Sequence, residues 1–192
     1  MSTPPDEYYT AERWQNWLER VEEEDLDPED EDAGRLLLNL QDDTAIAVAK
    51  VIAGHTDGEL GQERAMEELA NIREIVLPEV EMDDEDAAML VESVQTALVP
   101  VFYAAEEYVA EGPAEDGSVA DYISAAVDAE AEEDLDSAVG FCAQAGTLVI
   151  DGDSLDREVV EDLEFGYVAE RVNGLDSLQT AMRDPEVVEE EE

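Results

Sequence analysis

The stretch from Ala87 to Val109 reads AAMLVESVQTALVPVFYAAEEYV and decides the fold. Nearly every side chain in it is apolar, and the only charges are those of Glu92, Glu106 and Glu107. A helix that is apolar on almost all sides is typical of a buried position. We therefore predict that this stretch is the central helix of the protein. Its Pro100 is expected to kink the helix, because proline lacks a backbone N–H.

The rest of the chain has apolar residues at helical spacing between acidic ones, which predicts amphipathic helices. Such helices bury one face each, and a central apolar helix offers several of them a partner. The predicted fold class is therefore all-α: a single globular domain of six to eight helices around the central helix. The surrounding helices are predicted at 11–24, 28–54, 59–77, 118–133, 135–150, 155–172 and 175–183.

Two local alternatives remain open in this assignment. Asp27 and Pro28 are typical of a helix start, and the apolar phase then continues to Gly54, which favours one long helix. A break at Gln41 to Asp43 is the alternative, because an aspartate there could cap a new helix. The segment 147–150, ThrLeuValIle, could be a short strand instead of a helix end.

The domain boundaries are predicted from the residues that begin and end the helices. Residues 1–9 are predicted to be a flexible N-terminus, 10–183 the all-helical domain, and 184–192 a frayed acidic tail. A sub-boundary is placed at 112–117, because GlyPro and AspGly both interrupt helices there.

Charge is the second strong feature of the sequence. The chain has 55 acidic and 9 basic residues, a formal net charge of −46, and Lys50 as its one lysine. Since 44% of the residues are hydrophobic, the chain has enough apolar surface to fold. A folded surface with this charge repels itself in dilute salt but is screened and hydrated in molar salt. We therefore expect a cytoplasmic protein of a salt-in halophile; mimicry of nucleic acid by the acidic surface is a weaker alternative.

The same composition argues against several classes of protein. The nine cations are scattered singly, whereas direct nucleic-acid binding needs clustered ones, so no such binding is expected. The N-terminus has neither a cationic start nor an apolar run, so no secretory signal is expected. The longest uncharged apolar run, 97–105, is about half of what a membrane span needs, so no membrane partner is expected. A single cysteine excludes an internal disulfide.

No catalytic, cofactor-binding or metal-ligating residue is predicted, and no cofactor. His55 is the one histidine, and Ile52 stands where a di-iron Glu-x-x-His motif needs glutamate. Cys142 lies in an uncharged run and reads as a core residue. Lys50 reads as an ion-paired lysine at the edge of the core.

The first predicted helix carries Trp14 and Trp17 on one face and is our candidate docking surface. Because no set of catalytic residues is predicted, the leading prediction is a non-enzymatic protein-interaction or regulatory module whose partner is another protein. Assembly into a homo-oligomer stays open.

The rival prediction is an enzyme or small-ligand binder with a pocket at the Pro100 kink. Tyr103, Glu106 and Glu107 follow the proline and would line that pocket. Tyrosines on a kinked helix can line a pocket or an interface.

Three stretches carry a resemblance to a known family: YYTAERWQNWLERV (8–21), LNLQDDTAIAVAK (38–50) and LVPVFYAAEEYV (98–109). Together they resemble a haloarchaeal family of acidic proteins catalogued as domain of unknown function 2150. The resemblance covers most of the chain, to roughly residue 180. It implies no catalytic residue for this chain and agrees with the expectation of a halophile.

Overall fold

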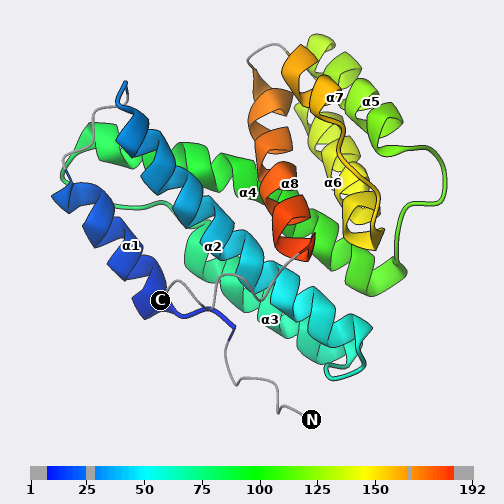
Figure 1. Cartoon of the computed structure of the whole chain (residues 1–192), viewed down its shortest axis with the longest axis horizontal. Helices are drawn as coiled ribbons and strands as arrows, with labels where there is room; N and C mark the ends of the chain where they lie inside the picture. The colour runs from blue at the N-terminus through cyan, green and yellow to red at the C-terminus, as the bar shows by residue number, and fades with distance from the viewer. Residues whose placement is uncertain (1–7, 25–28, 164–165, 184–192) are drawn as a thin grey trace.

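The computed structural model describes residues 8–24, 29–163 and 166–183, and these form eight α-helices (Figure 1). The predicted all-α single domain is confirmed. The predictions for residues 1–7, for 184–192 and for Asp27 and Pro28 lie outside the described residues. The helices are α1 (Ala11–Glu23), α2 (Glu31–Thr56), α3 (Gln62–Val76), α4 (Glu85–Glu111), α5 (Val119–Ala131), α6 (Leu135–Asp151), α7 (Arg157–Asp162) and α8 (Tyr167–Arg183).

Helix α4 is the predicted central helix, and it packs against α2, α3, α6 and α8. It begins where the sequence places acidic residues, because the Asp84 side chain accepts hydrogen bonds from the backbone N–H groups of Asp86 and Ala87 at 3.0 and 3.4 Å. Its most buried side chains include Val91, Leu98 and Phe102, all at 0% exposure. The helix continues through the buried Pro100 to Glu111.

Two main apolar clusters make up most of the core of the described residues, and a third, between α2 and α8, has only Ala45, Ile46, Ala49 and Ala181 as its buried members. The larger joins α1, α2, α3 and α4, with Ile150 and Leu178 reaching it from the C-terminal helices. The smaller joins α5, α6 and α8, which lie together on the other side in Figure 1. The predicted sub-boundary at 112–117 is the connection from α4 to α5, between these two parts.

Two glycines allow the C-terminal helices to approach α4 closely. A Cβ atom on Gly174 of α8 would lie 1.7 Å from the carbonyl oxygen of Ala97, which no real contact permits. A Cβ atom on Gly146 of α6 would lie 2.5 Å from the Cβ of Ala104. Both positions therefore require glycine for packing, whereas sequence reasoning would read them as weak points of a helix.

The prediction for the C-terminal helices was wrong in one respect. We predicted helices at 155–172 and 175–183, with the break near Gly174; the structure has a short α7 and then one continuous α8 through Gly174. Helix α8 begins after Gly166, where the Glu130 carboxylate of α5 accepts the backbone N–H groups of Tyr167 and Val168 at 2.9 and 3.2 Å. This cap comes from a distant segment, so local sequence could not indicate it.

Both open alternatives are settled by burial and backbone geometry. Helix α2 runs unbroken through Gln41 and Asp43, which are both buried. It begins at Glu31, with Asp30 as its N-cap, three residues later than the predicted start. Residues 147–150 are helical and belong to α6. Helix α3 begins at Gln62, three residues later than predicted.

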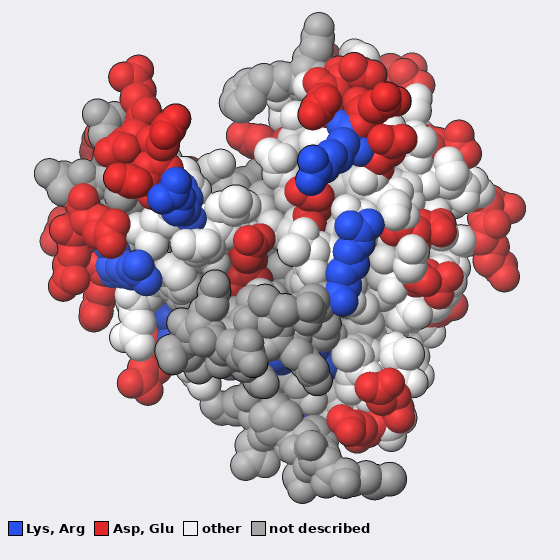
Figure 2. Space-filling model, in the orientation of Figure 1, with Lys and Arg blue, Asp and Glu red and all other residues white. Residues whose placement is uncertain are grey.

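Acidic side chains gather toward the outer edges of the face shown in Figure 2, with few basic ones between them. Among the described helices, α4 alone has the length and apolar composition that would suit a membrane span, and half of that apolar window is buried inside the fold.

Candidate binding site between α1 and α2

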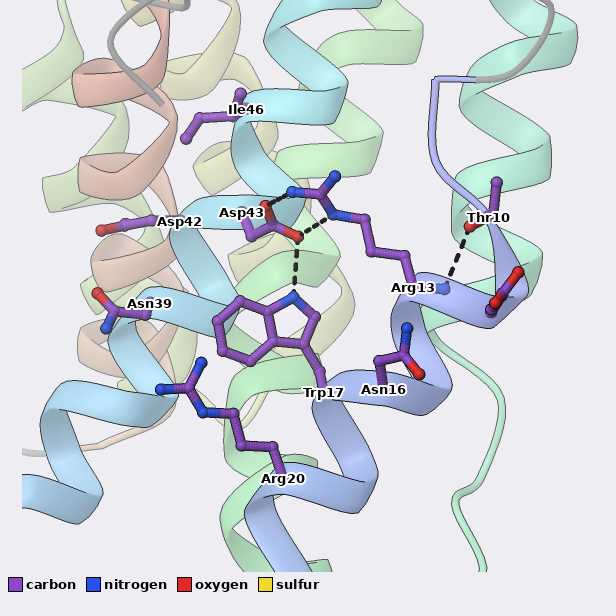
Figure 3. Close-up of a pocket in the computed structure, with 10 residues that line it drawn as sticks. Thr10, Arg13, Asn16, Trp17, Arg20, Asn39, Asp42, Asp43 and Ile46 are labelled. Atoms are coloured by element: carbon purple, nitrogen blue, oxygen red, sulfur yellow. Dashed lines mark hydrogen bonds and ion pairs between the residues drawn. The ribbon is translucent and has the colours of Figure 1, made fainter. Parts of the chain in front are cut away.

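An open pocket of about 670 Å³ lies between α1 and α2 (Figure 3). Its walls come from two segments that are about thirty positions apart in the sequence and are brought together by packing of α1 beside α2. The lining residues are Thr10, Glu12, Arg13, Asn16, Trp17, Arg20, Asn39, Asp42, Asp43 and Ile46. Two of the nine cations of the chain are therefore in one pocket.

Helix α1 presents different side chains to the pocket and to the core. Arg13, Trp17 and Arg20 are four and three positions apart, so they lie on one side of the helix, which faces the pocket. The other side, with Trp14, Leu18 and Val21, is buried. The helix starts at a defined residue because the Thr10 side chain accepts the backbone N–H of Arg13 at 3.1 Å.

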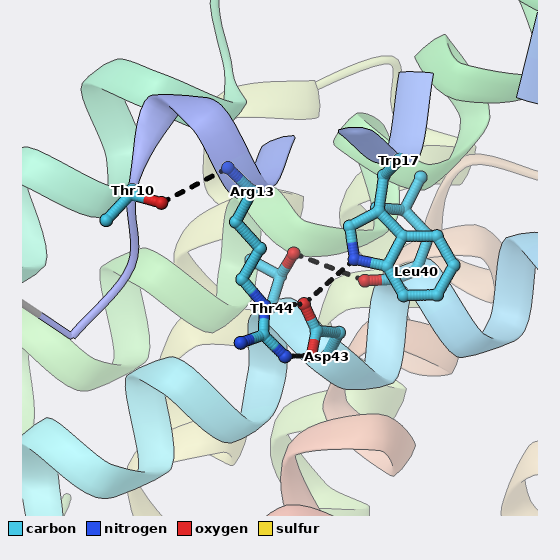
Figure 4. Close-up of polar contacts among 6 residues, drawn as sticks. All are labelled: Thr10, Arg13, Trp17, Leu40, Asp43 and Thr44. Carbon is cyan, nitrogen blue, oxygen red and sulfur yellow. Dashed lines mark hydrogen bonds and ion pairs between the residues drawn. The ribbon is translucent and has the colours of Figure 1, made fainter. Parts of the chain in front are cut away.

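Asp43 of α2 is the polar centre of the pocket wall, at 7% exposure (Figure 4). Its Oδ2 accepts hydrogen bonds from Arg13 Nε at 2.8 Å and from Trp17 Nε1 at 3.0 Å, and its Oδ1 is paired with Arg13 Nη2. A buried carboxylate is stable only when it is paired and hydrogen-bonded, and the planar guanidinium satisfies both of its oxygens. Asp43 thereby fixes the positions of Arg13 and Trp17.

Arg20 completes an aromatic and cationic surface at the mouth of the pocket. Its guanidinium carbon lies 5.5 Å from the centroid of the Trp17 ring, within the range of a cation–π contact. The Arg20 side chain is 58% exposed and also pairs with Glu24 at 3.5 Å. The Trp17 ring is half-buried, so a ligand can still reach part of it.

The remaining wall supplies polar groups. Asn16 of α1 and Asn39 of α2 are exposed and lie across the pocket from each other in Figure 3. Asp42 is half-buried and lies on the Asn39 side of the pocket in Figure 3. Burial raises the pKa of its carboxyl, the Ser177 hydroxyl lowers it by hydrogen bonding, and Asp176 raises it further. An indole ring, a guanidinium and two amides are groups that bind and orient a ligand.

The predicted docking pair is separated by the structure. Trp14 is 3% exposed and belongs to the core, so it cannot meet a partner while α1 is in place. Trp17 lines the pocket. The sequence alone does not show which side of α1 the rest of the fold covers, and both rings were therefore predicted to form one surface.

The three residues predicted to line a pocket near Pro100 follow that proline on α4. Tyr103 is 45% exposed. Glu106 pairs with Arg73 of α3 at 2.6 Å; burial raises the pKa of its carboxyl, while Arg73 lowers it. Burial, and then the neighbouring Glu111, raise the pKa of Glu107. The pocket between α1 and α2 contains none of the three.

Sequence reasoning missed Arg13, Arg20, Asn16, Asn39 and Asp43. Two signals pointed to part of this set. The helical spacing of Arg13, Trp17 and Arg20 was available, and so was a pair of aspartates in the middle of a helix, which needs a partner if either is buried.

Two other chemically reactive residues, His55 and Cys142, lie outside this pocket. The Nδ1 atom of His55 lies 3.2 Å from the backbone carbonyl oxygen of Leu60. Burial raises the pKa of the Cys142 thiol to about 12, which keeps it protonated. In the part of the chain that the structure describes, no group of three or more His, Cys, Asp or Glu side chains is arranged to hold a metal ion.

Comparison with known proteins gives one match. The family profile described as "Uncharacterized protein conserved in archaea (DUF2150)" matches residues 7–191, nearly the whole chain. No curated protein and no solved structure matches. The chain therefore belongs to the archaeal family DUF2150.

Proposed function

We propose that this protein is a non-enzymatic interaction module that binds a segment of another protein in the pocket between α1 and α2. The observation that carries the proposal is the half-exposed Trp17, held by its hydrogen bond to the buried Asp43 and covered on one side by Arg20. Tryptophan and arginine are the residue types most enriched among interface positions that dominate binding energy.

The surface is fixed before a partner arrives. Asp43 holds Arg13 by two contacts and Trp17 by one, so these side chains lose little further conformational freedom on binding. Preorganisation of this kind improves affinity, because ordering of long side chains otherwise opposes association.

The polar groups favour a peptide segment as ligand. Asn16 and Asn39 each offer an amide donor and acceptor, which match the N–H and C=O groups of a peptide backbone. Arg20 can meet a carbonyl or carboxylate of the ligand, and the exposed part of Trp17 can cover an apolar side chain. A volume of about 670 Å³ accommodates a few residues.

We further propose that the protein works in a cytoplasm of molar salt, as its net charge of −46 suggests. Under those conditions charge–charge attraction acts over about 3 Å only. Contacts of the indole ring and of the amides would then contribute more to recognition than long-range attraction.

The test compares two arginines. Arg20→Ala removes the cation from the pocket, and Arg35→Ala removes one from α2 outside it. Each arginine forms one ion pair with an acidic residue three or four positions away, Arg20 with Glu24 and Arg35 with Asp32, which makes them a matched pair. We expect affinity capture from host lysate at native salt to recover a stoichiometric partner with the wild type. Arg20→Ala should lower that recovery about tenfold or more, and Arg35→Ala should leave it unchanged.

A photo-cross-linking residue at Asn16, with Glu19 as control, tests direct contact. Both side chains are exposed on α1, and of the two only Asn16 lines the pocket. Cross-linking of the captured partner from position 16 and not from position 19 supports the proposal. Recovery that is equal for both arginine variants, or no partner at all, overturns it.

A further inference from the structure

A second groove lies on the other side of α2, between α2, α4 and α8, with a volume of about 490 Å³. In Figure 1, α8 lies beside α2, and α4 passes behind both. The groove shares only Asp42 with the pocket described above. Its lining residues are Gly34, Leu37, Leu38, Gln41, Asp42, Leu90, Ser93, Val94, Ala97, Glu170, Asn173, Asp176, Ser177 and Thr180.

The floor of the groove is apolar and partly open to solvent. Leu38 is 52% exposed and lies beside other apolar side chains of the groove. Leu37 and Leu90 are half-buried, and Val94 and Ala97 form the buried base. Side chains of this kind along a concave surface suit a large apolar side chain from outside the molecule.

Rigid contacts hold the floor in place. The Gln41 side chain donates to the carbonyl oxygen of Asn173 at 3.2 Å and to Ser177 Oγ at 2.9 Å, which ties α2 to α8. Gly174 holds α8 directly against the Ala97 carbonyl of α4. The groove is therefore set by the packing of three helices and does not depend on a loop.

The charged side chains of the wall are all acidic. Asp42, Glu170 and Asp176 line the groove, and no lysine or arginine does. Neither Asp42 nor Asp176 forms an ion pair with a described residue. The two carboxylates are near enough for Asp176 to affect the protonation of Asp42. A cation placed between them would relieve that repulsion.

We infer that the groove between α2, α4 and α8 docks an amphipathic helix of a partner protein that inserts large apolar side chains beside Leu38 and places lysine or arginine next to Asp42 and Asp176. This goes beyond the proposed function, because it concerns a different surface. Helix-in-groove recognition uses apolar residues at i, i+3, i+4 and i+7, and flanking charges determine which helices are accepted.

Charge also decides against two other occupants. Residues 184–192 of this chain read DPEVVEEEE, so they would bring carboxylates to a carboxylate wall. A second copy of the chain has 55 acidic and 9 basic residues, so its surface offers few cations to place directly beside Asp42 and Asp176. A cationic helix is the occupant that complements the wall.

The test uses a fluorescein-labelled helical peptide of eighteen residues built from leucine and lysine, with the leucines along one face. Fluorescence anisotropy at 1 M KCl measures its affinity, since long-range attraction is screened there. A second peptide with glutamate in place of lysine tests the charge. Leu38→Glu places a charge in the groove, and Leu135→Glu is its matched control, because Leu135 is also a half-exposed leucine, at 42%, and lies on α6 outside the groove.

We expect the lysine peptide to bind the wild type and the glutamate peptide to bind at least tenfold more weakly. Leu38→Glu should weaken binding about tenfold, Leu135→Glu less than twofold, and Asp176→Asn severalfold. Circular dichroism verifies that each variant is folded; Leu38 and Leu135 are exposed, so both substitutions are tolerated by the core.

Three results would overturn the inference: no binding to the wild type, equal binding of both peptides, or equal effects of Leu38→Glu and Leu135→Glu. Arg20→Ala distinguishes this site from the pocket between α1 and α2, since it should leave the peptide affinity unchanged. If it abolishes peptide binding, the peptide occupies the first pocket and the groove is not the site.

Discussion

The two sides of α2 are held to their neighbours by different forces, and the adjacent residues Asp43 and Asp42 show the difference. On the α1 side, Asp43 is buried and bound by Arg13 and Trp17. On the α8 side, Asp42 is half-buried and pairs with no described cation. There α2 is attached to α8 by the hydrogen bonds of Gln41 and by a small apolar cluster of Ala45, Ile46, Ala49 and Ala181. Helix α8 is in turn packed closely on α4, with Gly174 against Ala97.

This difference teaches that the two attachments respond to different changes. The α1 helix makes a smaller interface with the rest of the fold and relies on a charged network in it. Electrostatic interactions depend on salt and on single charged groups. Packing of α8 on α4 depends on interatomic distances and is insensitive to salt.

The largest expected effect is that of salt on the whole fold. Lowering KCl from molar to about 0.1 M lengthens the screening distance from about 3 to about 10 Å, and a net charge of −46 then repels itself across the molecule. We expect the far-ultraviolet circular dichroism signal of the helices to collapse in this range.

Tryptophan fluorescence sharpens that experiment, because both tryptophans of the chain, Trp14 and Trp17, are in α1. If α1 is attached more weakly than α8, the fluorescence change has its midpoint at a higher KCl concentration than the dichroism change. Coincident midpoints would mean that α1 and the other helices separate in one cooperative step. A dichroism signal that is unaffected by salt would contradict the expected adaptation to molar salt.

Gly174→Ala should have the next largest effect, because its Cβ would lie 1.7 Å from the Ala97 carbonyl oxygen. Such overpacking forces α8 away from α4 and should lower the free energy of unfolding by about 3 kcal/mol or more. Gly140→Ala in α6 is the matched control, since nothing lies within 4 Å of its added Cβ. It should raise stability by up to about 1 kcal/mol, as alanine favours helices. Urea unfolding at fixed KCl measures both; similar values for the two variants would refute close packing at Gly174.

The fold could be predicted from the sequence because burial and helical periodicity agree along most of it. The mostly apolar stretch at 87–109 led directly to α4, and the apolar phase across Asp42 and Asp43 led to a single α2. The prediction failed near Gly174. There a glycine that fits a tight helix contact looks the same in sequence as one that ends a helix, and the Glu130 cap that starts α8 is distant in sequence.

The candidate site could be predicted only in part. Trp17 was identified, but its neighbours depend on which side of α1 faces α2, and that is decided by packing. Asp42 and Asp43 are chemically identical neighbours in the sequence. They differ only because successive helix residues point about 100° apart, one toward Arg13 and one toward Ser177.

Neutralising each aspartate in turn tests the comparison directly. Asp43→Asn leaves Arg13 without its carboxylate and weakens the hydrogen bond from Trp17, so it should lower the free energy of unfolding by about 2 kcal/mol. The Arg13 side chain is 42% exposed, and its contact with water keeps the loss below that of a fully buried pair. Asp42→Asn should change stability by less than about 0.5 kcal/mol, or raise it, because a carboxylate near Asp176 is removed. Equal losses would mean that the two sides of α2 are held in the same way.

The smallest effect is on the protonation of Asp42. Burial is the main cause that raises its pKa above the ordinary 3.8, Ser177 opposes it, and Asp176 adds to it. Carbon-13 NMR titration of the side-chain carboxyl should therefore give a midpoint above 3.8. Asp176→Asn should lower this midpoint without returning it to 3.8, because burial remains.

The raised pKa has a defined consequence for stability. Between the unfolded pKa and the higher folded pKa, the folded state binds more protons at Asp42 than the unfolded state, so this group makes the protein less stable as pH rises through that window. Asp42→Asn removes this titrating carboxyl. The stability difference between variant and wild type should therefore shift in favour of the variant from about pH 4 upward. A difference that does not vary with pH would place Asp42 in water. A difference of the opposite sign would mean that a cation lies beside Asp42, as Arg13 lies beside Asp43 on the other side of the helix.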